Sequence, residues 1–354
     1  MPTSPRTVPA VPAVLAGVLL LAACGSESAA PGGDGRVRAE ALCPSEVAEY
    51  GGVPSTGGAS AGGVSAGVSA GGSSDGGRPS GTPTPLPLPS PDATAESEVK
   101  VTALYAWGND SGCESDFSAD FEVTNRGTKK ATYTVTLGFF SSSGSIVDHV
   151  ERTVAPVAPG RTVEGIAGLG RSLGDTPDVS NVKVEKVRSV PADEAPSASG
   201  PCPASGLHVY ADQGDAAMGL RVVGLHLVNC GTRPYELNGY PELEILDEDH
   251  DDVDSVRILH GTDRISTGTG GTGSPQRVVL RPGEAAQAAL AWRNTTQFGE
   301  PVNAPYLRVR AKQGARPVTV VPELDLGTTG KLGVGPWMRD ETYRDPAAAG
   351  TPRP

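Results

Sequence analysis

The sequence has few aromatic residues, few basic residues and no internal hydrophobic run of membrane-spanning length. Aromatic side chains make up 5% of its 354 residues, and 41 acidic residues outnumber 29 basic ones, which gives a net charge of -12. A chain this acidic repels nucleic acid and anionic lipid headgroups, because neither polyanion can release counterions to a partner of its own sign. We therefore expect no nucleic-acid partner. The hydrophobic fraction of 37% also predicts that part of the chain lies outside any folded core.

The most apolar stretch lies at the N-terminus. Arg6 precedes an apolar run from Val8 to Ala23, which Pro9 and Pro12 interrupt. A basic residue before a short apolar run is typical of a secretory signal peptide, and the run is too short and too interrupted to span a bilayer. We expect residues 1–23 to be this signal.

The residues that close the run, Leu21-Ala22-Ala23-Cys24, resemble the lipobox of bacterial lipoproteins. In that class the cysteine becomes the mature N-terminus and carries a diacylglyceryl thioether, so the resemblance implies that Cys24 is lipidated. Each buried CH2 contributes about 0.8 kcal/mol, so acyl chains such as palmitate would hold the acidic chain on the outer face of the cytoplasmic membrane. The alternative is an ordinary cleaved signal in which the cysteine is coincidental.

The cysteine count agrees with an exported protein. Five cysteines become four when Cys24 is set aside, and outside the cytoplasm four are expected to form two disulfides. Three connectivities are open, and a local bridge between Cys202 and Cys230 would leave Cys43 for Cys113. A zinc site is not expected, because the chain has no CxxC or CxC pair and no histidine at ligand spacing to a cysteine.

Composition divides the chain into segments. Residues 51–97 are rich in Gly, Ser and Pro, with a polyproline spacer from Thr82 to Pro89, and hold too few apolar side chains to offset backbone entropy. The predicted segments are the signal 1–23, a lipidated tether 24–35, a short ordered arm 36–50, a disordered linker 51–97, a first β-sandwich 98–190, a Pro-rich linker 191–201, a second β-sandwich 202–337 and a tail 338–354.

Two-residue alternation of apolar and polar side chains predicts the fold class. It is clear in Val99 to Leu104 and Ala119 to Thr124, and similar runs continue at regular spacing to Val321 without helical periodicity. We expect an all-β protein with two antiparallel, immunoglobulin-like β-sandwiches. The first resembles generic immunoglobulin-like extracytoplasmic modules. The two show no obvious common register, so no internal repeat is predicted.

The second sandwich carries a further resemblance. Its motifs are Leu225 to Thr232, Leu237 to Pro241, and Leu280 to Ala286 with Trp292. Together they resemble a domain of unknown function found in actinobacterial secreted lipoproteins, over roughly 202–337. The resemblance implies a sandwich and an exported address. It implies no catalytic residues.

The acidic run from Asp247 to Asp254 is the densest charged cluster. Carboxylates on a turn between strands could supply the several oxygens that calcium needs, and the candidate ligands are Asp247, Asp249, Asp251 and Asp252. The run lacks the glycine and the distal glutamate of an EF-hand loop. A solvated acidic turn that protects a sheet edge is therefore the favoured interpretation.

Histidines and aromatic residues suggest two other binding chemistries. His208 and His226 lie on neighbouring predicted strands and, with His250 or His260, could converge on copper or zinc, whereas His149 lies apart. Solvent-facing or singly hydrogen-bonded histidines are the more common case. Aromatic faces can stack on sugars, but the four aromatic candidates are expected to fill cores. These candidates are Trp107, Trp292, Trp337 and Tyr240.

Two enzyme-like signatures are weak. The segment Gly268 to Gly273 fits GxGxxG, but a dinucleotide site needs a helix after it, and here Ser274-Pro275 and a strand follow. We expect a mobile Gly/Thr hairpin loop. The segment Gly63 to Gly67 fits GxSxG but lies in the low-complexity linker, with no sheet to strain the turn.

These observations favour a membrane-anchored, monomeric, extracytoplasmic lipoprotein that binds a surface or cell-wall partner, without cofactor and without catalysis. Loops such as Ser266 to Pro275 would give specificity. The first alternative is a calcium, transition-metal or carbohydrate binder. The second is an unrecognised hydrolase, in which a nucleophile, a base and an orienting group would converge from separate loops.

Overall fold

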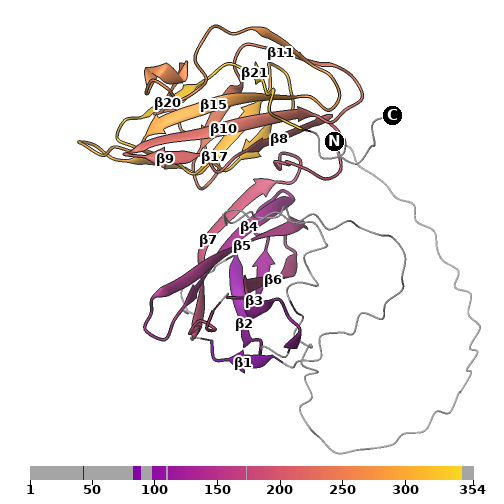
Figure 1. Ribbon diagram of the computed structural model, residues 1–354, viewed down its shortest axis with the longest axis vertical. Coiled ribbons are helices and arrows are strands. Elements are labelled where there is room, and N and C mark those ends of the chain that lie inside the picture. The colour runs from indigo at the N-terminus through magenta and orange to yellow at the C-terminus, as the bar shows by residue number, and fades with distance from the viewer. Residues whose placement is uncertain (1–42, 44–82, 89–97, 109–110, 173, 345–354) are drawn as a thin grey trace, which may run out of the picture. The chain divides into compact units, whose positions relative to one another are not determined.

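The computed structural model describes residues 43, 83–88, 98–108, 111–172 and 174–344 (Figure 1). Within these ranges almost every regular element is a strand, and η2 (Thr262–Arg264) is a single short 3-10 turn. The predicted all-β class is confirmed. None of the described segments forms a helix long and apolar enough to cross a membrane.

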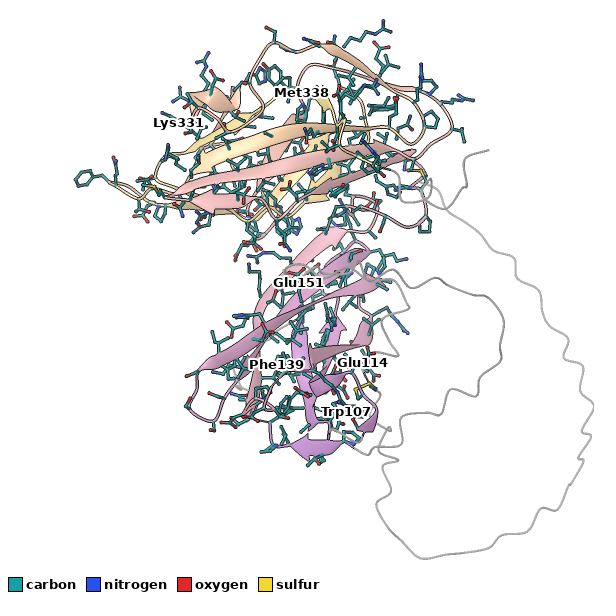
Figure 2. The ribbon with its side chains drawn as sticks, viewed as in Figure 1. Trp107, Glu114, Phe139, Glu151, Lys331 and Met338 are labelled. Atoms are coloured by element: carbon teal, nitrogen blue, oxygen red, sulfur yellow. A yellow bond between two sulfur atoms is a disulfide. The ribbon has the colours of Figure 1, made fainter. Side chains whose placement is uncertain are left out.

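The N-terminal sandwich consists of two layers. One sheet has the order β1-β2-β3-β6 and the other β5-β4-β7, all antiparallel. Alternate residues of both sheets fill a shared core, among them Phe121, Leu137 and Phe139 (Figure 2). The strands are β1 (Thr84–Leu86), β2 (Val99–Ala106), β3 (Ser115–Thr124), β4 (Ala131–Phe140), β5 (Ile146–Val157), β6 (Thr162–Gly170) and β7 (Asn181–Pro191).

The C-terminal sandwich is larger. Its main sheet has the order β13-β20-β15-β10-β8, with β9 paired to β10 and β21 to β15, and it packs over the pairs β11-β14 and β16-β19 and the sheet β12-β17-β18. The pair β13-β20 is parallel, an exception to the predicted antiparallel arrangement. The strands are β8 (Leu207–Ala211), β9 (Asp215–Ala217), β10 (Leu220–Asn229), β11 (Tyr235–Asn238), β12 (Glu242–Leu246), β13 (Arg257–His260), β14 (Arg277–Leu280), β15 (Ala285–Arg293), β16 (Val302–Ala304), β17 (Tyr306–Arg310), β18 (Val318–Val320), β19 (Leu324–Gly327), β20 (Lys331–Val334) and β21 (Met338–Arg339).

Strand β1 corrects one prediction. Residues 51–97 were expected to be an unstructured linker, yet Thr84–Leu86 add to the edge of β2 as an antiparallel strand. Pro85 is tolerated because an edge strand leaves one side of its backbone unpaired. Leu86 and Leu88 pack against the N-terminal core. This burial of apolar side chains offsets the backbone entropy that the segment loses on becoming ordered.

Both expected disulfides are present. Cys43 bonds to Cys113, and Cys202 bonds to Cys230. The first bridge is buried against Trp107 beside the N-terminal sandwich (Figure 2). The connectivity with a local C-terminal bridge is thereby confirmed.

A buried asparagine organises one end of the N-terminal sandwich. Asn125 is 1% exposed, and its Nδ2 donates to the carbonyls of Lys129 and Val157 at 2.8 Å each. Its Oδ1 accepts from the N–H of Gly127 at 2.8 Å. One side chain therefore ties the end of β3 to the turn before β4 and to the end of β5.

The C-terminal sandwich contains the same arrangement. Asn229 is 2% exposed, and its Nδ2 donates to the carbonyls of Arg233 at 2.8 Å and Leu280 at 2.9 Å. Its Oδ1 accepts from the N–H of Gly231 at 3.1 Å. The partners stand at the same offsets as those of Asn125 along the turn, and Leu280 ends β14 as Val157 ends β5.

We call Asn125 and Asn229 the hub asparagines. The strands around them also pair in the same register. The residue before each hub pairs with the first residue of a later strand, Thr124 with Thr162 and Val228 with Ala285. The Pro-Gly turn before that strand donates its glycine N–H to the hub carbonyl in both sandwiches. The two sandwiches are therefore two copies of one arrangement of strands. Strand β2 corresponds to β8 and β9 together, β3 to β10, β4 to β11, β5 to β14 and β6 to β15. This common register was not obvious in the sequence, which predicted no internal repeat.

The predicted linker 191–201 is bonded to the C-terminal sandwich. Glu194 accepts from Arg308 Nε at 2.9 Å and from Thr319 Oγ1 at 2.7 Å. The hydroxyl of Ser197 lies 2.8 Å from Nδ1 of His208. This Pro-rich segment is held by charge-assisted hydrogen bonds, which are stronger than neutral ones.

Candidate functional site

A polar pocket of about 550 Å³ lies at one end of the C-terminal sandwich. It is lined chiefly by β9, β10, β15, β16 and β19 and by the residues beside them, including Asp215, Arg221, Trp292, Asn303 and Asp325. Pockets of this size accommodate small molecules or single side chains of a partner.

Asp325 is the centre of a hydrogen-bond network in this pocket. Its Oδ1 accepts from Trp292 Nε1 at 2.7 Å, and its Oδ2 accepts from Arg221 Nη2 and Asn294 Nδ2 at 2.9 Å each. The indole is 1% exposed, so its N–H needs a partner inside the protein. The carboxylate is thus fixed in position and its charge is balanced by the guanidinium.

The N-terminal copy of the repeat shows that this arrangement of strands does not require polar side chains at the pocket. Arg221 faces Trp292 across β10 and β15, and the corresponding pair in the N-terminal copy is Phe117 opposite Leu169. Those two side chains are each 5% exposed and close that end with apolar packing. The C-terminal copy therefore replaces an apolar plug with an ion pair and an open pocket, which marks the pocket as a candidate site.

Strand β9 forms one wall of the pocket. Its three residues are all exposed, and it pairs with β10 alone, so within the described ranges no strand covers its other edge. Met218 follows directly and is 100% exposed, at a φ of 48° that non-glycine residues seldom adopt. This edge was not foreseen because three residues are too short to show alternation.

The acidic turn is tied by its own backbone. Oδ1 of Asp247 accepts from the N–H of Asp249 at 3.0 Å and from that of Asp251 at 2.9 Å, and Asp252 bridges back to Leu246. Within the described ranges, no three His, Cys, Asp or Glu side chains are grouped so as to hold a metal ion. The run therefore forms a tight turn in which one carboxylate already serves as an acceptor.

The histidines occupy separate places. His250 stacks on Tyr306 at 4.2 Å between ring centroids, and His260 stacks on Tyr240 at 4.0 Å. His149 is exposed in β5 of the other sandwich. The expected alternative of convergence on copper or zinc is thus not met by the described side chains.

Three histidines have one partner of the kind found in a catalytic triad, and the longest of these contacts joins His250 Nε2 to Ser189 Oγ at 3.5 Å. His226 lies between carboxylates, with Nε2 3.1 Å from Asp212 Oδ2 and Nδ1 4.0 Å from Asp340 Oδ2. Burial alone would raise the pKa of Asp212, but hydrogen bonds from His226 and two backbone N–H groups bring it below its ordinary value.

His208 is not part of a complete catalytic triad, and neither is His226. His208 is 7% exposed and contacts Ser197, and burial lowers its pKa. Among the described contacts, the pair around His226 has no hydroxyl nucleophile and the pair around His208 has no orienting acid. Neither has the three groups that a hydrolase of this kind requires.

The tryptophans fill cores, as the sequence predicts. Trp107, Trp292 and Trp337 are at most 5% exposed, and each indole N–H has a hydrogen-bond acceptor. Tyr240 is half-buried on the C-terminal core. A sugar-binding face built from the three tryptophans is therefore excluded by their burial.

The Gly/Thr loop differs from its prediction. It follows η2 and is not a hairpin, because β13 pairs with β20 and β14 pairs with β11. Gly271 packs so closely on Gly335 that a Cβ on either would collide with the other backbone. The predicted hairpin at Gly268 to Gly273 is therefore wrong, and the centre of the loop packs against the segment after β20. The GxSxG segment and Cys24 lie outside the described residues.

Comparisons with known proteins give one family. Residues 202–338 match the model of a domain of unknown function, DUF4232, which confirms the predicted C-terminal domain of unknown function. No curated protein matches the chain. Among solved structures it is similar to a transglutaminase of red sea bream at 12% identity, over 70% of this chain and 32% of that one, with a TM-score of 0.16. A likeness at this level carries no argument about fold or activity.

Proposed function

We propose that this chain is a lipid-anchored extracytoplasmic lipoprotein that binds a partner polypeptide through the pocket of its C-terminal sandwich, without catalysing a reaction. The observation that carries the proposal is the Asp325 network. Its carboxylate has three donors, and these hold it as a fixed polar wall. Prearranged polar groups of this kind give specificity to a binding site.

Three further observations support the extracytoplasmic part. Both disulfides need an oxidising compartment to persist, and together they use every cysteine except Cys24. Cys24 ends the lipobox-like motif. A thioether-linked lipid at this position would hold an acidic chain at a membrane that its charge would otherwise avoid.

The anchoring is tested by metabolic labelling with palmitate followed by membrane fractionation. The unmodified chain should take up label and sediment with membranes. Cys24→Ser should lose the label and become soluble, whereas Cys24→Ser that stays on membranes would refute the anchor.

The binding role is tested by crosslinking on intact cells. A photoreactive residue in place of Asn303, which lines the pocket, should yield a discrete crosslinked species. The same residue in place of Ile146, which is 54% exposed in the other sandwich, is the matched control. Equal crosslinking at both positions, or none at position 303, would contradict a binding site in the pocket.

A further inference from the structure

The two copies of this arrangement of strands differ in what covers one sheet edge. In the N-terminal copy, β1 lies along β2, with Thr84 opposite Ala106 and Pro85 opposite Tyr105. The covering strand is an extended, proline-containing segment from elsewhere in the chain. The molecule itself thus shows what kind of polypeptide this edge accepts.

The register locates the corresponding edge in the C-terminal copy. Ala106 pairs with Phe117, and Ala216 pairs with Arg221. Phe117 and Arg221 stand equally far before their hub asparagines, so Ala216 in β9 corresponds to Ala106 in β2. The positions that β1 covers in one copy are therefore the positions that β9 leaves open in the other.

The pocket occupies this open place. Gln213, Gly214, Asp215 and Ala216 all line it, and they span the positions corresponding to those that β1 covers. Unpaired edges attract extended peptides because backbone N–H and C=O groups supply hydrogen bonds without regard to sequence. The exposed Met218 at the end of β9 offers apolar contact to the same peptide.

The lining predicts which side chain enters. Pro85 of β1 lies opposite Tyr105, and Tyr105 corresponds to Asp215, so the residue at position 85 of an added strand lies beside Asp215. The nearby pocket contains the polar network of Arg221, Trp292 and Asp325. A polar side chain suits this position better than proline, because polar groups left unpaired on burial are costly.

Four carboxylates line the pocket, against two guanidinium groups that are already paired with Glu248, Glu323 and Asp325. Asp215 is the fourth carboxylate and forms no ion pair with a described cation, so the complementary side chain is basic.

We propose that β9 and its pocket bind an extended, basic segment of a partner polypeptide, which adds to the sheet edge as β1 does in the N-terminal copy. This rests on the proposed function, since it names the ligand of the same site. The inserted residue places a lysine or arginine beside Asp215. The backbone of the segment pairs with Gly214–Ala216.

The test uses the whole chain with Cys24→Ser and a labelled, capped hexapeptide with the sequence of residues 83–88. Three forms are compared by fluorescence anisotropy: the unchanged peptide, Pro85→Lys and Pro85→Glu. The Pro85→Lys peptide should bind at least about tenfold more tightly than Pro85→Glu, because opposite charges attract and like charges repel beside Asp215. Hydrogen exchange should show new protection of amides in the segment Gly214–Ala216.

Variants of the protein make the result specific. Asp215→Lys should weaken binding of the Pro85→Lys peptide by about tenfold. Asp148→Lys, at an exposed position in β5 of the other sandwich, makes the same change in net charge and should leave binding within about twofold. Asp215 is exposed, so its variant should keep the melting temperature of the parent chain.

Three outcomes would overturn the proposal. They are equal binding of the Lys and Glu peptides, protection located away from β9, or β9 amides already protected in the free chain, which would place the chain's own linker at the edge. Failure here with successful crosslinking at position 303 would leave the binding role standing and exclude only the basic strand as its ligand.

Discussion

The hub asparagines give the sharpest test of the repeat. Asn229→Ala removes three hydrogen bonds, each worth about 1 kcal/mol, and leaves the buried carbonyl of Leu280 without that donor, which costs about 1–2 kcal/mol more. We therefore expect the free energy of unfolding of the C-terminal sandwich to fall by about 3–5 kcal/mol. Asn125→Ala should have the same effect on the N-terminal sandwich.

Urea denaturation monitored by tryptophan fluorescence separates the two effects. Trp292 and Trp337 report the C-terminal core, and Trp107 lies beside the N-terminal one. The exposed Asn238 makes no side-chain hydrogen bond to the described residues, so Asn238→Ala is the matched control, with an expected change within about 0.5 kcal/mol.

A small effect of Asn229→Ala would refute the structural role of the hub asparagines. If Asn229→Ala lowered stability by less than about 1 kcal/mol, its hydrogen bonds would not hold the turn and the strand together. Because the two hubs lie in separate cores, the double variant with Asn125→Ala should also be additive within about 0.5 kcal/mol.

Three further predictions concern pH and the C-terminal bridge. Burial, with Glu164 nearby, raises the pKa of Asp120 to about 6. As the pH rises, this carboxyl ionises in the unfolded chain before it ionises in the folded one, so the stability of the N-terminal sandwich falls between about pH 4 and pH 6. The full shift corresponds to about 3 kcal/mol, which solvent screening reduces to about 1–2 kcal/mol, and Asp120→Asn should abolish the fall in melts at pH 4.5 and 7.5. Burial lowers the pKa of His208, so C-terminal stability should instead be lost as the pH falls below 6.5, and His208→Gln should flatten that dependence. Replacing both Cys202 and Cys230 with serine opens a loop with a separation of 28 residues and should lower C-terminal stability by about 3–4 kcal/mol in calorimetry; an unchanged melt would contradict this.

Alternation of side chains was sufficient to predict the all-β class and most strands, because one face of each strand lies on a core. Runs such as 220–229 and 285–292 lie in β10 and β15 as expected. Short strands such as β9 and β16 escaped prediction, since three residues do not define a period. The parallel pair β13-β20 depends on chain crossing, which alternation does not encode.

The sequence contains a trace of the repeat, but a four-residue pattern alone does not indicate a repeated fold. Asn125-Arg126-Gly127-Thr128 and Asn229-Cys230-Gly231-Thr232 share the pattern Asn-x-Gly-Thr. Only the hydrogen bonds show that the asparagine is a buried hub and not simply a turn residue.

The candidate site was missed for a related reason. Asp325 and Arg221 are remote in sequence, and neither belongs to a known motif. They meet because β10 and β19 converge at one end of the sandwich. Charge clusters such as the acidic turn stand out in sequence, whereas a site assembled from single residues on separate strands does not.

The bridge between Cys43 and Cys113 shortens the covalent path between Cys24 and the N-terminal sandwich. For a chain held at Cys24, the covalent path to the sandwich ends at Cys43, which at roughly 3.5 Å per residue allows at most about 65 Å. With the bridge reduced, the path would continue to Thr84 in β1, and the same arithmetic allows about 210 Å. If the chain is anchored at Cys24 as proposed, the oxidation state of this cysteine pair would decide whether the sandwich is confined near the bilayer or can search a layer roughly three times as deep.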